Sequence, residues 1–305
     1  MIQLTKEIIF VFLSFTLLSC QSQKLYHQSY VGLGTYIEIT SPYKEAGKIA
    51  FEEIKKIESL LSKYDPSSEI YLLNQNAKAK LSPQTLYVIK KAKEFWEKSE
   101  GAFDITVGVL LELWGFDKHS RYRVPTDEEI RQALDYVGLD KVKIDEENRI
   151  VEIKKGMILD LGGIAKGYAV DCAVSKLKEK GINSALINIG GDIYCLGKKF
   201  GKPWRVGIKD PKTKGIRKIV ELEDKAIATS GSYENYFSKD NFIYTHIFDP
   251  KKGRPVDSKI ISITIVADDC LTADALATAT FVLENEKRKT LVEKLSAKIE
   301  DICLR

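Results

Sequence analysis

The stretch at residues 160–171, DLGGIAKGYAVD, constrains the fold of this chain more than any other. It follows an apolar run at 157–161 that predicts a strand, and it passes through Gly162 and Gly163 into a segment with helical periodicity. Because glycine lacks a Cβ atom, a ligand can approach the backbone closely there. A strand, a tight turn and a helix start together predict a place where N–H groups and the Lys166 cation face a phosphate, although such turns also occur without a ligand.

The rest of the chain mixes helical and strand-like periodicity without strict alternation. Helices are predicted at 44–63, 82–99, from 126 onward, at 164–180 and at 272–283. Strands are predicted at 31–39, 184–196, 204–208, 218–222, 226–229, 244–248 and 260–266, with a hairpin at 149–161. The pattern therefore favours an α+β fold of mixed β-sheets with flanking helices over a doubly wound sheet. We expect a single large domain at 31–305, since 305 residues suffice for a large core.

The N-terminus has the pattern of an export signal. Lys6 precedes an apolar run at 8–18 that is too short to span a bilayer as a structural helix. The run ends in LLSC, which resembles a bacterial lipoprotein processing site and implies cleavage before Cys20 and acylation of its sulfur. We therefore expect a lipoprotein signal peptide at 1–19 and a lipidated tether at 20–30, with a plain secretory signal or an N-terminal anchor as alternatives. Acyl chains would hold the protein on a membrane facing the periplasm, the inner rather than the outer one.

Charge and cysteine content exclude other classes of protein. The net charge is +4 and the charges are interspersed, without a basic stripe, so no nucleic-acid partner is expected. The four cysteines after Cys20 form no C-x-x-C pair. We expect them to be buried free thiols, and a disulfide stays open in an oxidising compartment: Cys172, Cys195, Cys270 and Cys303.

Two polar positions suggest chemistry. Asp274 and Thr278 are four residues apart in a predicted helix, which places both oxygens on one face, and a hard cation such as Mg²⁺ takes oxygen ligands. The alternative is that Thr272 caps the helix and Asp274 only favours its N-terminus. His246, one of three histidines, precedes a turn and is a candidate general base, although a structural histidine is as good an interpretation.

The order of the motifs is more specific than any one of them. Gly34-Thr35 is followed by SKYDPSSE, GAFDITVG, LWGF, DLGGIAKGYAVD, NIGGDI, PWRVGI, ATSGSYENY, HIFDPKKGRPV and TADALATA. From residue 31 to 285 this succession resembles the bacterial FAD:protein FMN transferases, the ApbE flavin transferase family. The resemblance implies Mg²⁺-dependent transfer of FMN from FAD to a Ser or Thr hydroxyl of a target protein through a phosphoester, with release of AMP. It also implies an extracytoplasmic flavoprotein as acceptor, such as a subunit of a redox complex.

The resemblance also assigns residues. Asp274, Thr278 and the carbonyl of Gly163 correspond to Mg²⁺ ligands, whereas Asp160 and Lys166 correspond to FAD contacts. We expect His246, Lys166 and Asp274 to be catalytic. The surroundings of the flavin and adenine rings would be Leu33, Tyr64, Ala102, Phe103, Asp104 and Phe248. Leu33 and Phe248 stand where Met and Ile are frequent in the family, and both are apolar replacements.

Two other functions fit the same residues. A Mg²⁺-dependent FAD pyrophosphatase would use water in place of the protein hydroxyl and give FMN and AMP. A non-catalytic periplasmic FAD-binding lipoprotein would bind the dinucleotide without releasing AMP.

Overall fold

The centre of the molecule is a seven-stranded sheet in which every neighbouring pair of strands is antiparallel. The computed structural model describes residues 24–117, 120–233, 235–240 and 242–305, so the predicted signal segment and Cys20 lie outside it. In spatial order the strands are β1 (Tyr26–Gly32), β2 (Thr35–Ser41), β6 (Ala185–Ile189), β7 (Asp192–Leu196), β10 (Lys225–Gly231), β15 (Ile260–Ala267) and β16 (Lys298–Leu304). The chain thus has the α+β fold with flanking helices that its sequence predicts.

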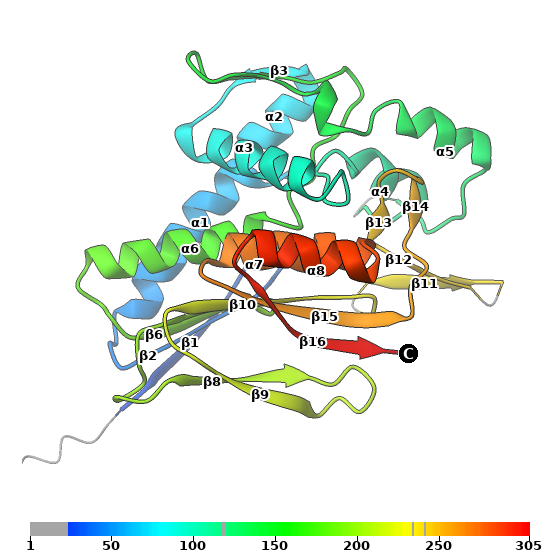
Figure 1. Cartoon of the computed structure of the whole chain (residues 1–305). Helices are drawn as coiled ribbons and strands as arrows, with labels where there is room; N and C mark the ends of the chain where they lie inside the picture. Colours follow the sequence, from blue (N-terminus) through cyan, green and yellow to red (C-terminus); the bar gives the residue numbers. More distant parts are fainter. Residues whose placement is uncertain (1–23, 118–119, 234, 241) are drawn as a thin grey trace, which may run out of the picture.

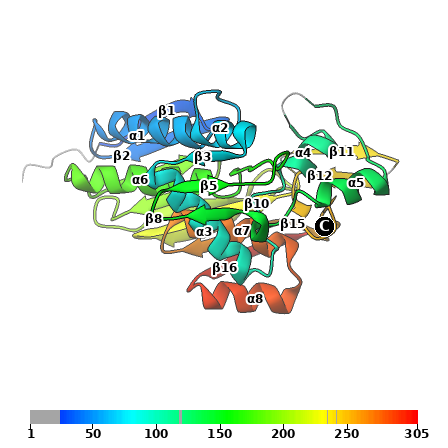
Figure 2. The ribbon, with the colours of Figure 1, turned by 90° about the horizontal axis from the view of Figure 1, so that it is seen from above.

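Four smaller sheets surround the central one. They are β3 (Lys78–Lys80) with β5 (Ile150–Glu152) and β4 (Lys143–Asp145), β8 (Trp204–Lys209) with β9 (Ile216–Leu222), β11 (Tyr236–Lys239) with β12 (Phe242–Thr245), and β13 (Phe248–Asp249) with β14 (Arg254–Pro255). Helices cover one face of the large sheet and the β8–β9 hairpin covers the other (Figures 1 and 2). Trp204 and Val206 of this hairpin pack against Cys195 and Ile227 of the sheet, so the sheet is buried on both faces at β7 and β10, whereas Val31 of β1 and Tyr36 of β2 stay exposed.

All five predicted helices are present, among others. The helices are α1 (Ala46–Leu61), α2 (Glu69–Asn76), α3 (Pro83–Lys98), α4 (Gly108–Trp114), α5 (Asp127–Leu134), α6 (Ala165–Glu179), α7 (Cys270–Val282) and α8 (Asn285–Lys294), with a 3₁₀ turn at Leu139–Lys141. Capping side chains explain where two of these helices, α3 and α5, begin. Ser82 accepts a hydrogen bond from the Thr85 N–H before α3, and the capping box of Thr126 and Glu129 opens α5.

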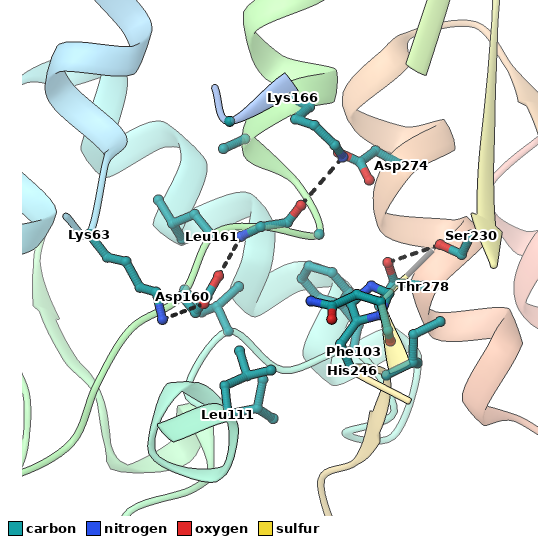
Figure 3. A pocket seen from close by; sticks show the side chains of 18 of the residues that line it. Lys63, Phe103, Leu111, Asp160, Leu161, Lys166, Ser230, His246, Asp274 and Thr278 are labelled. Carbon is teal, nitrogen blue, oxygen red and sulfur yellow. Dashed lines mark hydrogen bonds and ion pairs between the residues drawn. The ribbon is translucent and has the colours of Figure 1, made fainter. Parts of the chain in front are cut away.

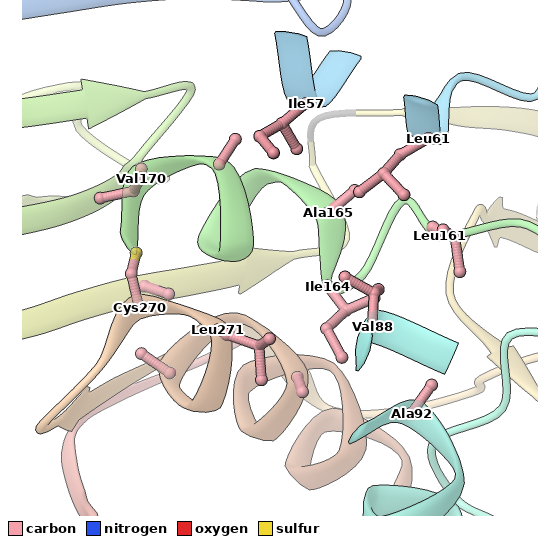
Figure 4. Close-up of a cluster of buried hydrophobic side chains, with 14 of the residues drawn as sticks. Ile57, Leu61, Val88, Ala92, Leu161, Ile164, Ala165, Val170, Cys270 and Leu271 are labelled. Atoms are coloured by element: carbon pink, nitrogen blue, oxygen red, sulfur yellow. The ribbon is translucent and has the colours of Figure 1, made fainter. Parts of the chain in front are cut away.

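Helices α6 and α7 lie against each other at the centre of the helical layer. A Cβ atom added to Gly167 in α6 would lie 2.3 Å from the carbonyl oxygen of Cys270 at the start of α7, so only glycine allows this approach. Apolar side chains of α1 and α3, including Leu61 and Val88, pack around the turn that leads into α6 (Figure 4). The close contact fixes the glycine turn relative to α7.

The predicted hairpin at 149–161 is wrong. β5 pairs with β3 and β4 instead, and the segment at 157–161 is not a strand, since Ile158 makes only one isolated bridge to Val107. The backbone of this segment forms hydrogen bonds with a side chain instead of with a neighbouring strand. The Asn74 amide donates to the Leu159 carbonyl at 3.0 Å and accepts from the Leu159 N–H at 2.8 Å. The backbone is thereby satisfied without a ladder.

Several boundaries differ from the prediction because turns interrupt the apolar runs. The run at 31–39 is split by a turn at Leu33 and Gly34, and β1 begins at Tyr26, inside the segment expected to be a tether. The run at 184–196 forms two strands joined at Gly190 and Gly191, both with positive φ. The run at 244–248 is divided between β12 and β13.

The start of α7 also differs from the prediction. The helix begins at Cys270, and its cap is Asp269, whose carboxylate accepts from the Thr272 N–H at 2.7 Å, so Thr272 is not the cap. The four cysteines after Cys20 are free thiols, and three of them are buried. No helix in the described part of the chain is long and apolar enough to cross a bilayer.

Candidate active site

A cavity of about 460 Å³ opens between the C-terminal end of α1, the start of α6, the middle of α7 and the loop that follows β12. Figure 3 shows side chains from these elements pointing into it. All twelve residues that the sequence predicts for the site line this one cavity: Leu33, Tyr64, Ala102, Phe103, Asp104, Asp160, Gly163, Lys166, His246, Phe248, Asp274 and Thr278. The structure therefore brings together segments that are more than two hundred residues apart, while the roles assigned to these residues stay predictions.

The glycine turn joins the cavity floor to α6. The carboxylate of Asp160 accepts a hydrogen bond from the Gly162 N–H at 2.8 Å, which closes the turn. At the start of α6 the Ala165 N–H donates to the Leu161 carbonyl at 2.8 Å and the Gly167 N–H donates to the Asp274 carboxylate, so these helix-start donors are already satisfied within the protein. Gly163 lies beside Thr278, because an added Cβ atom would sit 3.1 Å from the Thr278 hydroxyl oxygen.

A buried group of charges occupies the inner end of the cavity. The Lys166 ammonium lies 2.5 Å from the Asp192 carboxylate and 3.5 Å from that of Asp274. Burial alone would lower the pKa of Lys166, but Asp192 and Asp274 raise it above its ordinary value, so the side chain is a cation. Burial raises the pKa of Asp274, opposed by Lys166 and by the Gly167 N–H.

Reciprocal hydrogen bonds connect α6 and α7. The Gly167 N–H of α6 donates to the Asp274 carboxylate of α7 at 3.1 Å. In return, the Asp171 carboxylate of α6 accepts from the N–H groups of Cys270 and Leu271 at the start of α7, each at 2.8 Å. Burial raises the pKa of Asp171 to about 7. These three bonds fix the metal-ligand candidate Asp274 relative to the glycine turn.

The oxygen atoms at this point fit a divalent cation. Asp274 offers a buried carboxylate, Thr278 a hydroxyl and Gly163 a carbonyl, whereas no group of three or more His, Cys, Asp and Glu side chains suited to a metal exists in the described residues. Mg²⁺ is typically held by one or two carboxylates and completes its shell with water and substrate phosphate. A cation would also offset the burial of the Asp274 charge.

His246 has the tautomer of a general base. Its Nδ1 lies 3.0 Å from the carbonyl oxygen of Asn235, and since a carbonyl only accepts, Nδ1 carries the proton. Nε2 therefore has its lone pair free. Burial lowers the pKa of His246 below 6.5, opposed by the bond to Asn235, so the ring is neutral at pH 7.

A second buried cation lies at the mouth of the cavity. The Lys63 ammonium is 2.6 Å from the Asp117 carboxylate and 3.0 Å from that of Asp160, and the Tyr64 hydroxyl donates to Asp117 at 2.9 Å. Burial alone would lower the pKa of Lys63, but Asp160 and Asp117 raise it above its ordinary value. Lys63 therefore holds the acid that precedes the glycine turn.

Two of the residues predicted to surround the flavin and adenine rings, Phe248 and Asp104, are themselves buried. Phe248 is buried and packs edge-on against Trp114 and Phe116, whose ring centroids lie 6.1 and 5.9 Å away. Asp104 is also buried, accepts from the N–H and the hydroxyl of Thr106, and has a pKa raised to about 6 by burial. Both residues shape the cavity as well as line it.

Sequence reasoning did not assign Lys63, Asp117 or Asp192 to the site. Asp192 follows the Gly190-Gly191 turn and Lys63 precedes Tyr64, so proximity to a recognised motif was the available signal. Ser230, whose hydroxyl lies 3.4 Å from that of Thr278, belongs to the run at 228–231, which the sequence offers as an anion cradle or a simple turn and which forms the end of strand β10.

Comparison with known proteins agrees with this geometry. Residues 33–303 match the ApbE family. The FAD:protein FMN transferase of Vibrio cholerae is 37% identical over 79% of this chain and 74% of its own length, and that of Haemophilus influenzae is 31% identical over 96% and 90%. The crystal structure of the ApbE protein from Thermotoga maritima superposes with a TM-score of 0.82 at 38% identity, covering 90% of this chain and 91% of that one. The flavin transferase ApbE from Vibrio cholerae gives 0.80 at 32% identity, with coverage of 92% and 95%.

Proposed function

The chain belongs to the ApbE family, and from this premise we infer that it is an FAD:protein FMN transferase, which transfers FMN from FAD to a target protein. The observation that carries the inference is the gathering of the twelve predicted residues in one cavity, with Asp274, Thr278 and Gly163 at its inner end. A flavin-binding protein without catalysis would not need a cation site beside a neutral histidine.

We further propose that Asp274, Thr278 and the Gly163 carbonyl hold Mg²⁺. The ion would supply positive charge against the pyrophosphate oxygens of FAD, which phosphoryl transfer requires. Lys166 adds a fixed cation at the same place, because its ammonium lies 3.5 Å from the Asp274 carboxylate. The chain's own contribution is thus to orient the dinucleotide and to offset its charge.

The acceptor in this proposal is a Ser or Thr hydroxyl. Its oxygen forms a bond to the FMN phosphorus while the bond from that phosphorus to the bridging oxygen breaks, and AMP leaves with that oxygen. Nε2 of His246 accepts the hydroxyl proton, since its tautomer leaves the lone pair free. The product is FMN joined to the protein through a phosphoester.

We propose a lipoprotein setting on the basis of the sequence at 17–20, LLSC, which precedes the described residues. Acylated Cys20 would hold the enzyme on a membrane facing the periplasm, where an exported flavoprotein subunit is within reach.

The test mixes the purified domain, FAD and Mg²⁺ with an apo-subunit of a redox complex made without any flavin transferase. Intact mass should show one added FMN, and AMP should form in equal amount. Asp274→Asn should abolish both, whereas the control Asp268→Asn, an exposed acid just before α7, should keep them. Free FMN with unmodified protein would favour a pyrophosphatase, and FAD binding without AMP would favour a non-catalytic binder.

A further inference from the structure

We propose that the β11–β12 hairpin is the surface on which the acceptor polypeptide docks as an extended segment, an inference that rests on the proposed transfer of FMN to a protein. Among the described residues, Tyr236, Phe242 and Ile243 of this hairpin are exposed apolar side chains, and the catalytic histidine candidate directly follows its second strand. The hairpin projects from the side of the molecule, beside β13 and β14 (Figure 1).

The base of the hairpin is part of the active site. His246 follows Thr245, the last residue of β12, and Asn235 precedes β11. Both the backbone N–H and Nδ1 of His246 contact the Asn235 carbonyl, at 3.1 and 3.0 Å. Asn235 and His246 line the cavity. A polypeptide lying along the hairpin therefore reaches the histidine at its base.

The two faces of the hairpin differ in their packing. Phe237 and Tyr244 are opposite each other in the register and lie on the inner face. The Phe237 ring stacks on Tyr122 and on Tyr244, with 5.0 Å between centroids in each case, and Tyr244 packs against Trp114 at 5.4 Å. This face anchors the hairpin to the body of the protein.

On the opposite, outer face Thr245 at the base of the hairpin is buried, whereas Tyr236, Ser238 and Ile243 are exposed. Tyr236 pairs with Thr245 and Ser238 with Ile243, so Tyr236 and Ile243 are diagonal neighbours on the face opposite Phe237. Each is 49% exposed. Within the residues that the structure describes, neither strand pairs with a third strand. Free strand edges next to exposed apolar side chains are what an added extended segment uses, with backbone pairing for affinity and side-chain contacts for specificity.

The acceptor is the occupant that this geometry fits best. The reaction needs a second substrate whose hydroxyl arrives from solvent at Nε2 of His246, and an extended segment can place one residue there while its neighbours follow the hairpin. The apolar outer face indicates an acceptor segment with uncharged side chains next to its hydroxyl residue. A second copy of this chain is the competing occupant.

The test compares two double variants with serine at exposed positions. Tyr236→Ser with Ile243→Ser removes the proposed contacts, and Ile216→Ser with Ile219→Ser is the matched control on β9, where both side chains are also exposed. The probe is the same apo-subunit as above. The first variant should raise KM for the acceptor about tenfold, equivalent to about 1.4 kcal/mol, at unchanged kcat. The control should match the wild type, and the dissociation constant for FAD, from flavin fluorescence, should be the same in all three.

Each result that contradicts the proposal has a different interpretation. Equal acceptor KM in both variants overturns the docking surface. Weaker FAD binding in the hairpin variant means that the hairpin only supports the cavity, which also overturns it. A dimer that dissociates in sedimentation while KM stays constant assigns the face to a second copy. If the wild type transfers no FMN, the proposed function itself fails, and this result is distinct because it precedes any substitution.

Discussion

At the scale of single residues, the cavity keeps its buried charges in close groups. Lys63 holds Asp117 and Asp160 at the mouth, and Lys166 holds Asp192 and Asp274 at the inner end. A buried charge whose partner is removed costs more than the pair contributes. The two groups therefore determine both the stability of the site and the charge that it presents to a dinucleotide.

We expect Lys63→Met to destabilise the protein by about 3 kcal/mol, because two carboxylates lose their buried cation. Lys56→Met is the control, since Lys56 forms an exposed pair with Glu53 on α1 and should change the free energy of unfolding by less than about 1 kcal/mol. Urea denaturation measures both. Equal effects would show that Lys63 is not a structural centre of the cavity.

Substitution of His246 by Gln should lower kcat for FMN transfer by roughly 10²–10⁴-fold and leave FAD binding intact, since a general base is lost. Burial lowers the pKa of His246 below 6.5, so the base is deprotonated throughout the neutral range and the acid limb of kcat/KM in the wild type should lie below pH 6.5. A pH profile from 5 to 8 checks this. Activity that already falls between pH 8 and 7 would contradict it.

At the scale of elements, hydrophobic periodicity in the sequence predicts that α6 and α7 form, but it does not predict how closely the two helices approach each other. That separation depends on Gly167, whose missing Cβ permits contact with Cys270, and on hydrogen bonds between Asp171 and α7 that link positions about one hundred residues apart. Sequence spacing contains no signal for such pairs. The same limit explains the failed hairpin at 149–161, where the Asn74 side chain takes the place of a strand.

Gly167→Ala should destabilise the protein and weaken Mg²⁺ binding, although Ala in a helix is normally better than Gly by about 1 kcal/mol. The added Cβ would meet the Cys270 carbonyl at 2.3 Å and push α7 away from the glycine turn. Gly215→Ala is the control, because its new Cβ would meet no atom nearer than the Thr213 hydroxyl oxygen at 3.5 Å, which is ordinary van der Waals contact. Thermal unfolding and titration with Mg²⁺ give the two measurements. A more stable Gly167→Ala variant would refute the close contact.

The Asp171→Asn variant tests the hydrogen bonds between Asp171 and α7 through the pH dependence of the free energy of unfolding. The pKa of Asp171 is raised to about 7 by burial, so its folded form holds a proton that the unfolded chain releases near pH 3.9. Its contribution to stability is therefore complete below pH 3.9 and lost as the pH rises through about 7. The free energy of unfolding of the wild type minus that of the variant should fall from pH 5 to 7, by at most about 1.4 kcal/mol per pH unit. A flat difference would contradict the raised pKa.

At the scale of the whole molecule, the α+β class and all five predicted helices follow from periodicity alone, because amphipathic patterns report which faces are buried. The order of the strands in the sheet does not, since β2 pairs with β6 across more than a hundred residues. The resemblance to a family supplied the grouping of the site residues, and composition or spacing could not have done so. The proposed membrane setting rests on the sequence of residues that precede the described part of the chain.

Cys20→Ala should release the full-length protein from the membrane, since acylation requires the Cys20 sulfur. Wild-type protein should partition with detergent and sediment with membranes, and the variant should remain in the aqueous phase. FMN transfer by the detergent-solubilised enzyme should be unchanged, because Cys20 lies outside the matched residues 33–303. Membrane retention of the variant would point to an uncleaved N-terminal anchor.

The pairing of β2 with β6 also has a consequence for the time course of folding. Leu33 and Gly34 reach the cavity from the turn before β2, and Gly190 and Asp192 reach it from the turn after β6. The two halves of the pocket therefore lie more than a hundred residues apart in the sequence and meet only when β2 pairs with β6. Forming contacts between residues so distant along the chain is slow. During refolding, helical circular dichroism should consequently recover before the ability to bind the dinucleotide.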